Sequence, residues 1–271
     1  MPSHTPFISA ALSAALGTRW LGRQNVVLAD CASTNDLAAQ QARSGAGEGL
    51  VIVADTQSGG RGRLGRAWHS PAGENLYFSI LLRPTRPAVE IPPLTLLAGA
   101  ALAQALATFG VAPRLKWPND VQLTVDDRSP PRKVAGVLTE MATEGAHVAH
   151  VVVGIGLNVN TRQFPADLVD KATSLVLARA AAGGDARPLD RLTVLAAVLA
   201  AFENAYEKFR AEGPRAAVAL WNPHAALGTR CRVRADGRDV DGVSLGIDAD
   251  GALRVRDDDG RVHRVVSGEV T

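Results

Sequence analysis

The pattern of apolar and polar positions along the chain predicts both helices and strands. Apolar residues recur at helical spacing over residues 7–20, which predicts a short N-terminal helix. The string Ser33-Thr-Asn-Asp supplies capping side chains, so we expect a second helix from there to about Arg43, ending at Gly45. Helical patterns return further along the chain, at residues 93–109, 172–182 and 189–212.

Short apolar runs between these helices predict strands. They occupy residues 50–54, 76–82, 114–116, 121–125, 134–140 and 147–154. The later strands are joined by connections of hairpin length, which argues against a strict alternation of strand and helix. We therefore expect an α+β domain built on a mixed sheet.

The sequence pattern changes at Gly228, where short runs of alternating apolar and polar residues begin. Asp-Gly pairs at 236–237, 250–251 and 259–260 are typical of the turns between such strands. About four strands in this segment predict a small all-β barrel. We expect two domains, over residues 1–224 and 225–271.

Composition limits the classes of protein that this chain can be. Hydrophobic residues make up 46% and charged residues 21%, enough apolar material for a packed core. A formal net charge of +2 excludes a protein that coats polyanions through bulk charge. The N-terminus lacks the pattern of a secretory signal and the apolar runs suggest core helices, so we expect a cytoplasmic protein without a membrane partner. For Cys31 and Cys231, two reduced thiols are favoured over a single disulfide.

A loop rich in glycine and arginine follows the strand at 50–54. Arg61, Arg63 and Arg66 alternate with glycines, which let the backbone approach a ligand closely while the guanidinium groups bind carboxylate or phosphate. The loop formally matches a dinucleotide fingerprint, but no helix follows it, and it lacks the Gly-Lys-Ser/Thr of a P-loop. We interpret it as an anion-binding loop; the alternative is a solvated basic turn.

Three further strings suggest chemistry, although each has a plainer explanation. Lys116-Trp-Pro-Asn-Asp120 gathers polar groups where Asp120 could hold Mg²⁺, or it is a turn with local hydrogen bonds. Lys133 stands at the start of an apolar strand. It could bind a ligand there, or it could extend its charged end into solvent. Gly154 and Gly156 lie within a predicted strand. They would either let another group approach the backbone closely or mark a β-bulge.

Taken in order, these strings resemble the biotin–protein ligase family. The matching signatures are Ser33-Thr-Asn, Gln57 to Trp68 with its Gly-Arg-Gly-Arg-x-Gly-Arg core, Lys116-Trp-Pro-Asn-Asp, Lys133-Val-Ala-Gly-Val-Leu and Gly154-Ile-Gly-Leu-Asn-Val. The resemblance implies a mixed-sheet catalytic domain like that of class II synthetases and of biotin and lipoate ligases, followed by a small SH3-like barrel. It also implies ATP-dependent formation of biotinyl-5′-adenylate with release of pyrophosphate, and then transfer of biotin to a lysine.

The resemblance assigns roles to residues of this chain. Arg63, Lys133 and Lys116 would be catalytic, and Asp120 would hold Mg²⁺. The implied biotin-binding residues are Ser33, Thr34, Asn35, Gln57, Arg61, Gly62, Arg63, Lys133, Gly136, Gly154 and Gly156. The implied ATP-binding residues are Arg61, Arg63, Arg66, Trp68, Lys116, Asn119 and Asn158, with Trp68 covering the adenine side.

The resemblance also implies a partner, the biotin carboxyl carrier protein of acetyl-CoA carboxylase or of a related carboxylase, and a monomer or homodimer. About thirty residues precede Ser33, too few for the winged helix-turn-helix of the family's repressors, so we expect a monofunctional ligase that binds no DNA. One alternative is a lipoate–protein ligase, although the polar set at 33–35 and 57 would then serve no ureido group. The other is a non-catalytic nucleotide- or DNA-binding regulator, but the C-terminal segment carries eight arginines against nine acidic residues and offers no basic face.

Overall fold

A seven-stranded mixed sheet forms the centre of the computed structural model, which describes residues 8–126, 128–235 and 238–270. The strand order is β1-β2-β3-β7-β6-β5-β4, with β1 parallel to β2 and every other pair antiparallel. The strands are β1 (Asn25–Cys31), β2 (Val51–Gln57), β3 (Leu76–Leu82), β4 (Arg114–Lys116), β5 (Asp120–Leu123), β6 (Arg132–Glu144) and β7 (His147–Leu157).

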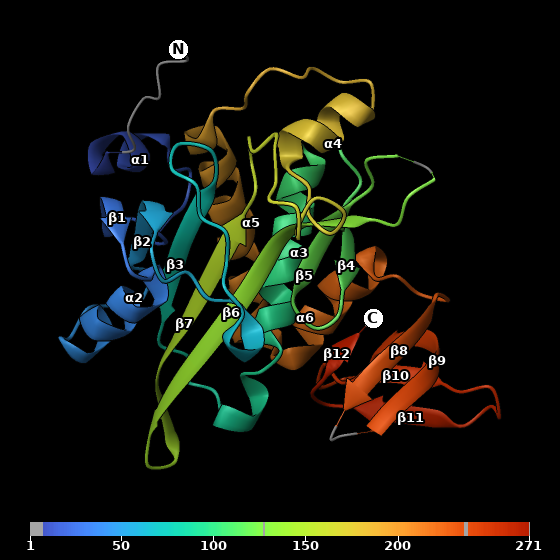
Figure 1. Ribbon diagram of the computed structural model, residues 1–271. Helices are drawn as coiled ribbons and strands as arrows, with labels where there is room; N and C mark the ends of the chain where they lie inside the picture. Colours follow the sequence, from blue (N-terminus) through green and yellow to red (C-terminus); the bar gives the residue numbers. More distant parts are fainter. Residues whose placement is uncertain (1–7, 127, 236–237, 271) are drawn as a thin grey trace.

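One face of this sheet carries the main hydrophobic core. Alternate residues such as Phe78 and Ile80 of β3 point into it, because successive side chains of a strand face opposite sides. The helices α3 (Leu94–Ala107), α5 (Arg191–Glu212) and α6 (Pro214–Trp221) pack on this face. Figure 1 shows them together behind the sheet. The smaller helices are α1 (Ser9–Ala15), η1 (Arg63–Gly65), η2 (Ala88–Glu90), α4 (Leu175–Ala181) and η3 (Asn222–His224).

The opposite face is covered only in part, by α2 (Thr34–Arg43). This helix packs its small residues Ala38 and Ala42 on Ile52 and Val152 of the sheet. Ser33 caps its start, with Oγ accepting from the Asp36 N–H at 3.5 Å. Beyond the start of α2, the same face of β3, β7 and β6 is covered by the loop that follows β2, with Trp68 against Gly136 and Gly156.

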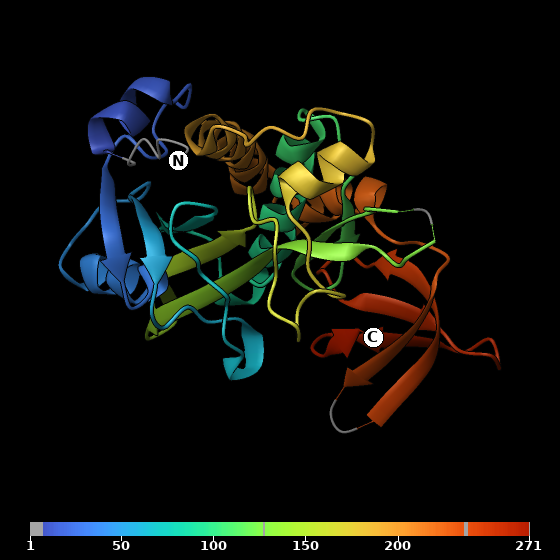
Figure 2. The ribbon, with the colours of Figure 1, turned by 45° about the horizontal axis from the view of Figure 1, so that its top comes forward.

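The C-terminal strands form a separate antiparallel sheet of order β11-β10-β9-β8-β12. Figure 2 shows it beside the main domain. Trp117 links the two parts, because its Nε1 donates to the Gly251 carbonyl at 3.1 Å. The strands are β8 (Arg230–Ala235), β9 (Arg238–Ile247), β10 (Leu253–Arg256), β11 (Val262–Val265) and β12 (Glu269–Val270).

Most of the predicted elements are confirmed, including the mixed sheet and the small all-β unit. The prediction was wrong in three places. The C-terminal sheet has five strands rather than about four, because the two-residue strand β12 carries no alternating pattern. The other two differences concern the N-terminal part of the chain. The first helix spans only Ser9–Ala15, because the chain turns at 19–22 before the sheet begins. β1 was missed, because its apolar core of Val26, Val27 and Leu28 is too short to stand out.

Three smaller expectations concern the Asp-Gly turns, the two cysteines and the longest apolar run. The Asp-Gly turns at 250–251 and 259–260 are present, whereas 236–237 lies outside the described residues. Cys31 and Cys231 are free thiols. By length and composition, Ala88–Ala107 resembles a membrane span, but 72% of its apolar window is buried within the fold, so it is packed as a core helix.

Candidate active site

Two glycines of β7 open a hollow on the face that α2 leaves uncovered. Gly154 lies between Ser79 of β3 and Leu138 of β6, and Gly156 lies between Tyr77 and Gly136. Because these glycines carry no side chain, other groups can approach the sheet closely at this point. The interpretation of Gly154 and Gly156 as a close-approach site is the one that the structure supports.

Two side chains rest on this glycine floor. A Cβ at Gly154 would lie 2.0 Å from Asn35 Oδ1, and one at Gly156 would lie 2.3 Å from Trp68 Cε2. Asn35 and Trp68 therefore leave a pocket of about 40 Å³. Its lining residues are Ser33, Thr34, Asn35, Gln57, Arg61, Gly62, Trp68, Asn119, Lys133, Gly136, Val137, Leu138, Gly154, Ile155 and Gly156. We call this the inner pocket.

Hydrogen bonds tie the polar side chains of the inner pocket together. Gln57 Oε1 accepts from the Thr34 N–H at 2.8 Å, and Ser79 Oγ lies 2.6 Å from Asn35 Oδ1. Asn35 Nδ2 donates to Glu140 Oε2 at 2.6 Å. Thr34 and Asn35 are 3% and 5% exposed, so these groups are ordered before any ligand arrives.

The arginine loop lies over this pocket and is held by carboxylates. Arg61 and Asp36 form a bidentate ion pair, in which Arg61 Nη1 donates to Asp36 Oδ2 at 2.8 Å. The hydrogen bond from Arg61 lowers the pKa of the Asp36 carboxyl. Leu64, at the tip of the loop, has a φ of 57° and is exposed, which is a strained backbone for a residue other than glycine.

The C-terminal strand β12 holds the other end of the loop. Arg66 Nη2 donates to Glu269 Oε2 at 2.6 Å, and Arg63 Nη1 donates to the Gly268 carbonyl at 3.1 Å. The hydrogen bond from Arg66 lowers the pKa of the Glu269 carboxyl. The loop thus joins the seven-stranded sheet to the C-terminal sheet.

Lys133 stands between the inner pocket and a second, larger cavity. Its Nζ forms an ion pair with Asp120 Oδ1 at 2.6 Å and lies 5.3 Å from the centre of the Trp68 ring. Lys133 lines both cavities, so its ammonium group can reach an anion in either one.

The larger cavity, which we call the outer cavity, has a volume of about 710 Å³. That volume is within the range of small-molecule sites. Basic side chains from several elements line it, among them Arg63, Arg66, Lys116, Lys133 and Lys171, and these groups favour a polyanion. Apolar groups for a planar ring come from Trp68, Trp117, Phe164 and Leu168.

All of the residues assigned from the motifs come together at these two cavities. Arg63, Arg66, Lys116, Asp120 and Asn158 line the outer cavity alone, and the remaining assigned residues line the inner pocket or both cavities. Arg63, which the resemblance also assigns to biotin, therefore lies outside the inner pocket in this structure. Trp68 lies against Gly156 in the inner pocket and also lines the outer cavity. It therefore extends beyond the adenine side, where the resemblance places it.

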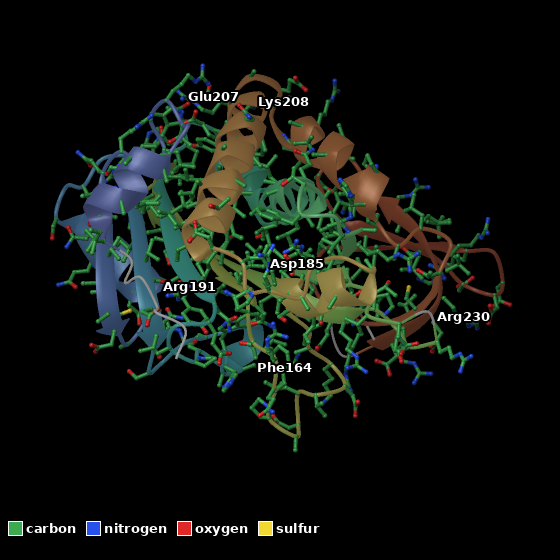
Figure 3. The ribbon with its side chains drawn as sticks, turned by 90° about the horizontal axis from the view of Figure 1, so that it is seen from above. Phe164, Asp185, Arg191, Glu207, Lys208 and Arg230 are labelled. Carbon is green, nitrogen blue, oxygen red and sulfur yellow. The ribbon has the colours of Figure 1, made fainter. Side chains whose placement is uncertain are left out.

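Sequence reasoning missed two contributors to the outer cavity. The loop before α4 supplies Phe164, Leu168 and Lys171, and β12 supplies Glu269. Figure 3 labels Phe164 on that loop. No periodic pattern marks these residues, although Phe164 is the one aromatic residue within a polar stretch.

The candidate metal ligand Asp120 lines the outer cavity. Within residues 8–126, 128–235 and 238–270, no group of three or more His, Cys, Asp or Glu side chains could hold a metal ion. A single carboxylate still suits Mg²⁺ when phosphate oxygens complete its coordination. Asp120 can act as that single carboxylate ligand when a phosphate group takes its place as the ion-pair partner of Lys133.

Comparisons with known proteins agree with this site. Residues 27–158 match the biotin/lipoate A/B protein ligase family and residues 226–271 match the biotin protein ligase C-terminal domain. The chain is 35% identical to the bifunctional ligase/repressor BirA of Bacillus subtilis over 94% of its own length and 76% of that protein. It is 34% identical to a biotin–[acetyl-CoA-carboxylase] ligase of Mycobacterium tuberculosis, over 94% of this chain and 90% of that one.

A solved structure supports the same assignment. The biotin protein ligase of Aquifex aeolicus, in complex with biotin and ATP, superposes with a TM-score of 0.75 and 29% identity, over 92% of this chain and 98% of that one. The two matched regions include the motifs of the inner pocket and the strand that holds the arginine loop. The chain belongs to the biotin protein ligase family and is a ligase.

Proposed function

We propose that this chain activates biotin with ATP and transfers it to a lysine of a biotin carboxyl carrier domain. In the first step, a biotin carboxylate oxygen attacks the α-phosphorus of ATP. The bond from that phosphorus to the bridging oxygen of the β-phosphate breaks, giving biotinyl-5′-adenylate and pyrophosphate. In the second step, the lysine amine attacks the acyl carbon, the bond to AMP breaks, and the nitrogen loses a proton.

One observation carries this proposal: Lys133 faces both cavities, at the point where they meet. Biotin in the inner pocket would direct its carboxylate toward Lys133, and ATP in the outer cavity would direct its α-phosphate there too. Two anions repel each other, so fixed positive charge at their meeting point lowers the barrier. Lys133 and the loop residue Arg63 supply that charge, and Asp120 would hold Mg²⁺, which neutralises phosphate oxygens when bound.

The inner pocket must enlarge to admit biotin. At about 40 Å³ it is far below the usual volume of a ligand site, and Trp68 occupies the floor. Trp68 belongs to the loop that carries Arg61, Arg63 and Arg66, so its displacement by biotin would move these arginines as well. We infer that the loop closes again over the adenylate and keeps it from water.

Isotope exchange tests the first step. Exchange of labelled pyrophosphate into ATP should require biotin and should not be supported by lipoate. Exchange with lipoate alone would make the chain a lipoate ligase. Mass spectrometry of a biotin carboxyl carrier domain, incubated with the chain, ATP and biotin, tests the second step. An unmodified carrier in the presence of active exchange would refute the proposed acceptor.

A further inference from the structure

We propose that Ser79 and Glu140 are positioning residues that fix the direction of the hydrogen bonds around the ureido group of biotin. Neither residue belongs to the motifs that identify the family. The inference rests on the proposed function, because it takes biotin as the ligand of the inner pocket. It concerns how that pocket distinguishes a ligand that offers N–H groups from one that does not.

The contacts form one continuous chain across the pocket. Ser79 is fully buried on β3, and its Oγ lies 2.8 Å from Thr34 Oγ1 and 2.6 Å from Asn35 Oδ1. Asn35 Nδ2 donates to Glu140 Oε2 at 2.6 Å and lies 3.3 Å from the Leu138 carbonyl oxygen. The chain therefore begins at Thr34 and ends on the carboxylate of Glu140.

The chemistry of its last members fixes how the Asn35 amide is turned. A carboxylate and a backbone carbonyl accept hydrogen bonds and cannot donate them. The NH₂ group of Asn35 must therefore face Glu140 and Leu138, and its Oδ1 must face Ser79. An amide oxygen only accepts, so Ser79 commits its single hydroxyl proton to Asn35.

Proton counting then settles the direction at Thr34. The two hydroxyl oxygens of Ser79 and Thr34 are 2.8 Å apart, a distance that requires a proton between them. The Ser79 proton is already committed, so Thr34 donates. The longer contact from Thr34 Oγ1 to Gln57 Oε1, at 3.1 Å, then has no proton of its own, and Gln57 Oε1 is satisfied by the Thr34 N–H at 2.8 Å.

This direction gives the pocket a defined polarity. Thr34 lines the inner pocket, and its Oγ1 can accept a hydrogen bond there but has no proton left to donate. Gln57 turns its Oε1 to the Thr34 N–H, so its Nε2 is the group left to donate. An acceptor beside a donor complements a ureido group, which offers N–H and C=O, whereas the dithiolane of lipoate has no N–H.

The Glu140 side chain is 46% exposed and lies 3.9 Å from Arg61 Nη2, and its negative charge strengthens the hydrogen bond from Asn35. Each hydroxyl or amide is polarised toward the carboxylate, and hydrogen bonds in series strengthen one another. Replacing Glu140 by Gln keeps an acceptor but removes the charge, and replacing it by Ala removes both. Replacing Ser79 by Ala breaks the chain and frees the Thr34 proton, which can then be donated to the ligand or to Gln57 Oε1 at 3.1 Å.

The test compares biotin with biotin methylated at either ureido nitrogen, using calorimetric titration of the full chain without ATP. We expect Glu140→Gln to weaken biotin binding by about fivefold, with Glu140→Ala larger, because a charged acceptor is worth roughly twice a neutral one. Ser79→Ala should reduce the preference for biotin over at least one methylated isomer by about tenfold, since Thr34 can then donate as well as accept.

Glu144→Gln is the matched control, because it removes the same charge from an exposed position on the same strand. It should leave both affinities unchanged. Equal losses for biotin and both methylated isomers in Ser79→Ala and Glu140→Ala, with the preference intact, would overturn the inference and leave the proposed function standing. If the unaltered chain fails to bind biotin, the proposed function itself is refuted.

Discussion

Among the loop arginines, Arg63 has the weakest attachment to the rest of the protein. Its Nη1 contacts the Gly268 carbonyl, whereas Arg61 and Arg66 each pair with a carboxylate. Arg63→Ala should therefore lower the rate of biotin-dependent pyrophosphate exchange by about 100-fold, the usual cost of one transition-state donor. The melting temperature should stay within about 2 °C, as for a surface substitution. A large fall in melting temperature with unchanged exchange would contradict this, and Arg254→Ala, an exposed arginine of β10, is the control.

The floor of the inner pocket tolerates no side chain at Gly154. Gly154→Ala would place a Cβ 2.0 Å from Asn35 Oδ1, and Asn35 is held by Ser79 and Glu140. We expect the dissociation constant for biotin to rise at least about tenfold, since one displaced hydrogen-bonded group costs about 1–3 kcal/mol. Fluorescence or calorimetric titration measures it. Gly17→Ala, which meets open space, should leave binding unchanged.

At the residue scale, motifs predicted the site where the residue types themselves carry the chemistry. Arginines among glycines, or the string Lys116-Trp-Pro-Asn-Asp120, are unusual enough to be noticed in a sequence. Ser79 is different, because a single serine in an apolar strand looks ordinary until the register places it beside Gly154. Glu140 and Phe164 likewise gain their meaning from tertiary neighbours.

The elements of the main sheet were predictable because each has a local signature. β3 is a run of apolar residues buried on both faces, and α2 starts at a capping serine. β1 could not be predicted, since it lies at the sheet edge with half-exposed residues and pairs with β2 through a non-local contact. The segment that leads into β1 depends on α5 for its hydrogen bonds.

Helix α5 holds the turn at residues 19–21 through a buried carboxylate. Glu203 is 3% exposed and accepts the backbone N–H groups of Arg19, Trp20 and Leu21 at 2.8, 3.0 and 2.9 Å. Glu203→Gln should cost about 2 kcal/mol, because charged acceptors of several N–H groups give strong hydrogen bonds. For a chain of this size the melting temperature should fall by about 5 °C in calorimetry.

The loss of stability caused by Glu203→Gln should depend on pH. Burial raises the pKa of Glu203, but the hydrogen bonds from the three N–H groups outweigh it, so the pKa is lowered overall. A carboxyl with a lowered pKa stabilises the fold above its unfolded pKa, and that contribution is lost as pH falls through the folded value. The difference between the variant and the unaltered chain should shrink in acid. Glu207→Gln, one turn further along α5 and labelled in Figure 3, weakens only the side-chain contacts with Trp20 Nε1 and Arg210 Nη1 and should have a smaller effect.

At the scale of the whole molecule, the outer cavity is shared between the two sheets. The C-terminal domain was predictable from its alternating strands and Asp-Gly turns. Its contribution to the site was not, because the pairing of Arg66 with Glu269 joins residues 203 positions apart. Such a contact follows from how the two parts dock, and Trp117 and Gly251 contribute to that docking.

The pair of Arg66 and Glu269 should therefore tune ATP binding more than stability. Both side chains are well exposed, at 64% and 37%, and such pairs contribute about 0.2–1 kcal/mol to folding. Arg66→Ala and Glu269→Gln should each raise the KM for ATP several-fold with the biotin affinity unchanged, since both residues line the outer cavity and not the inner pocket. The double variant should be no worse than Arg66→Ala alone, because the two residues act through one contact. Additive losses, or an equal rise in the KM for biotin, would show that β12 does not hold the loop in place for the nucleotide.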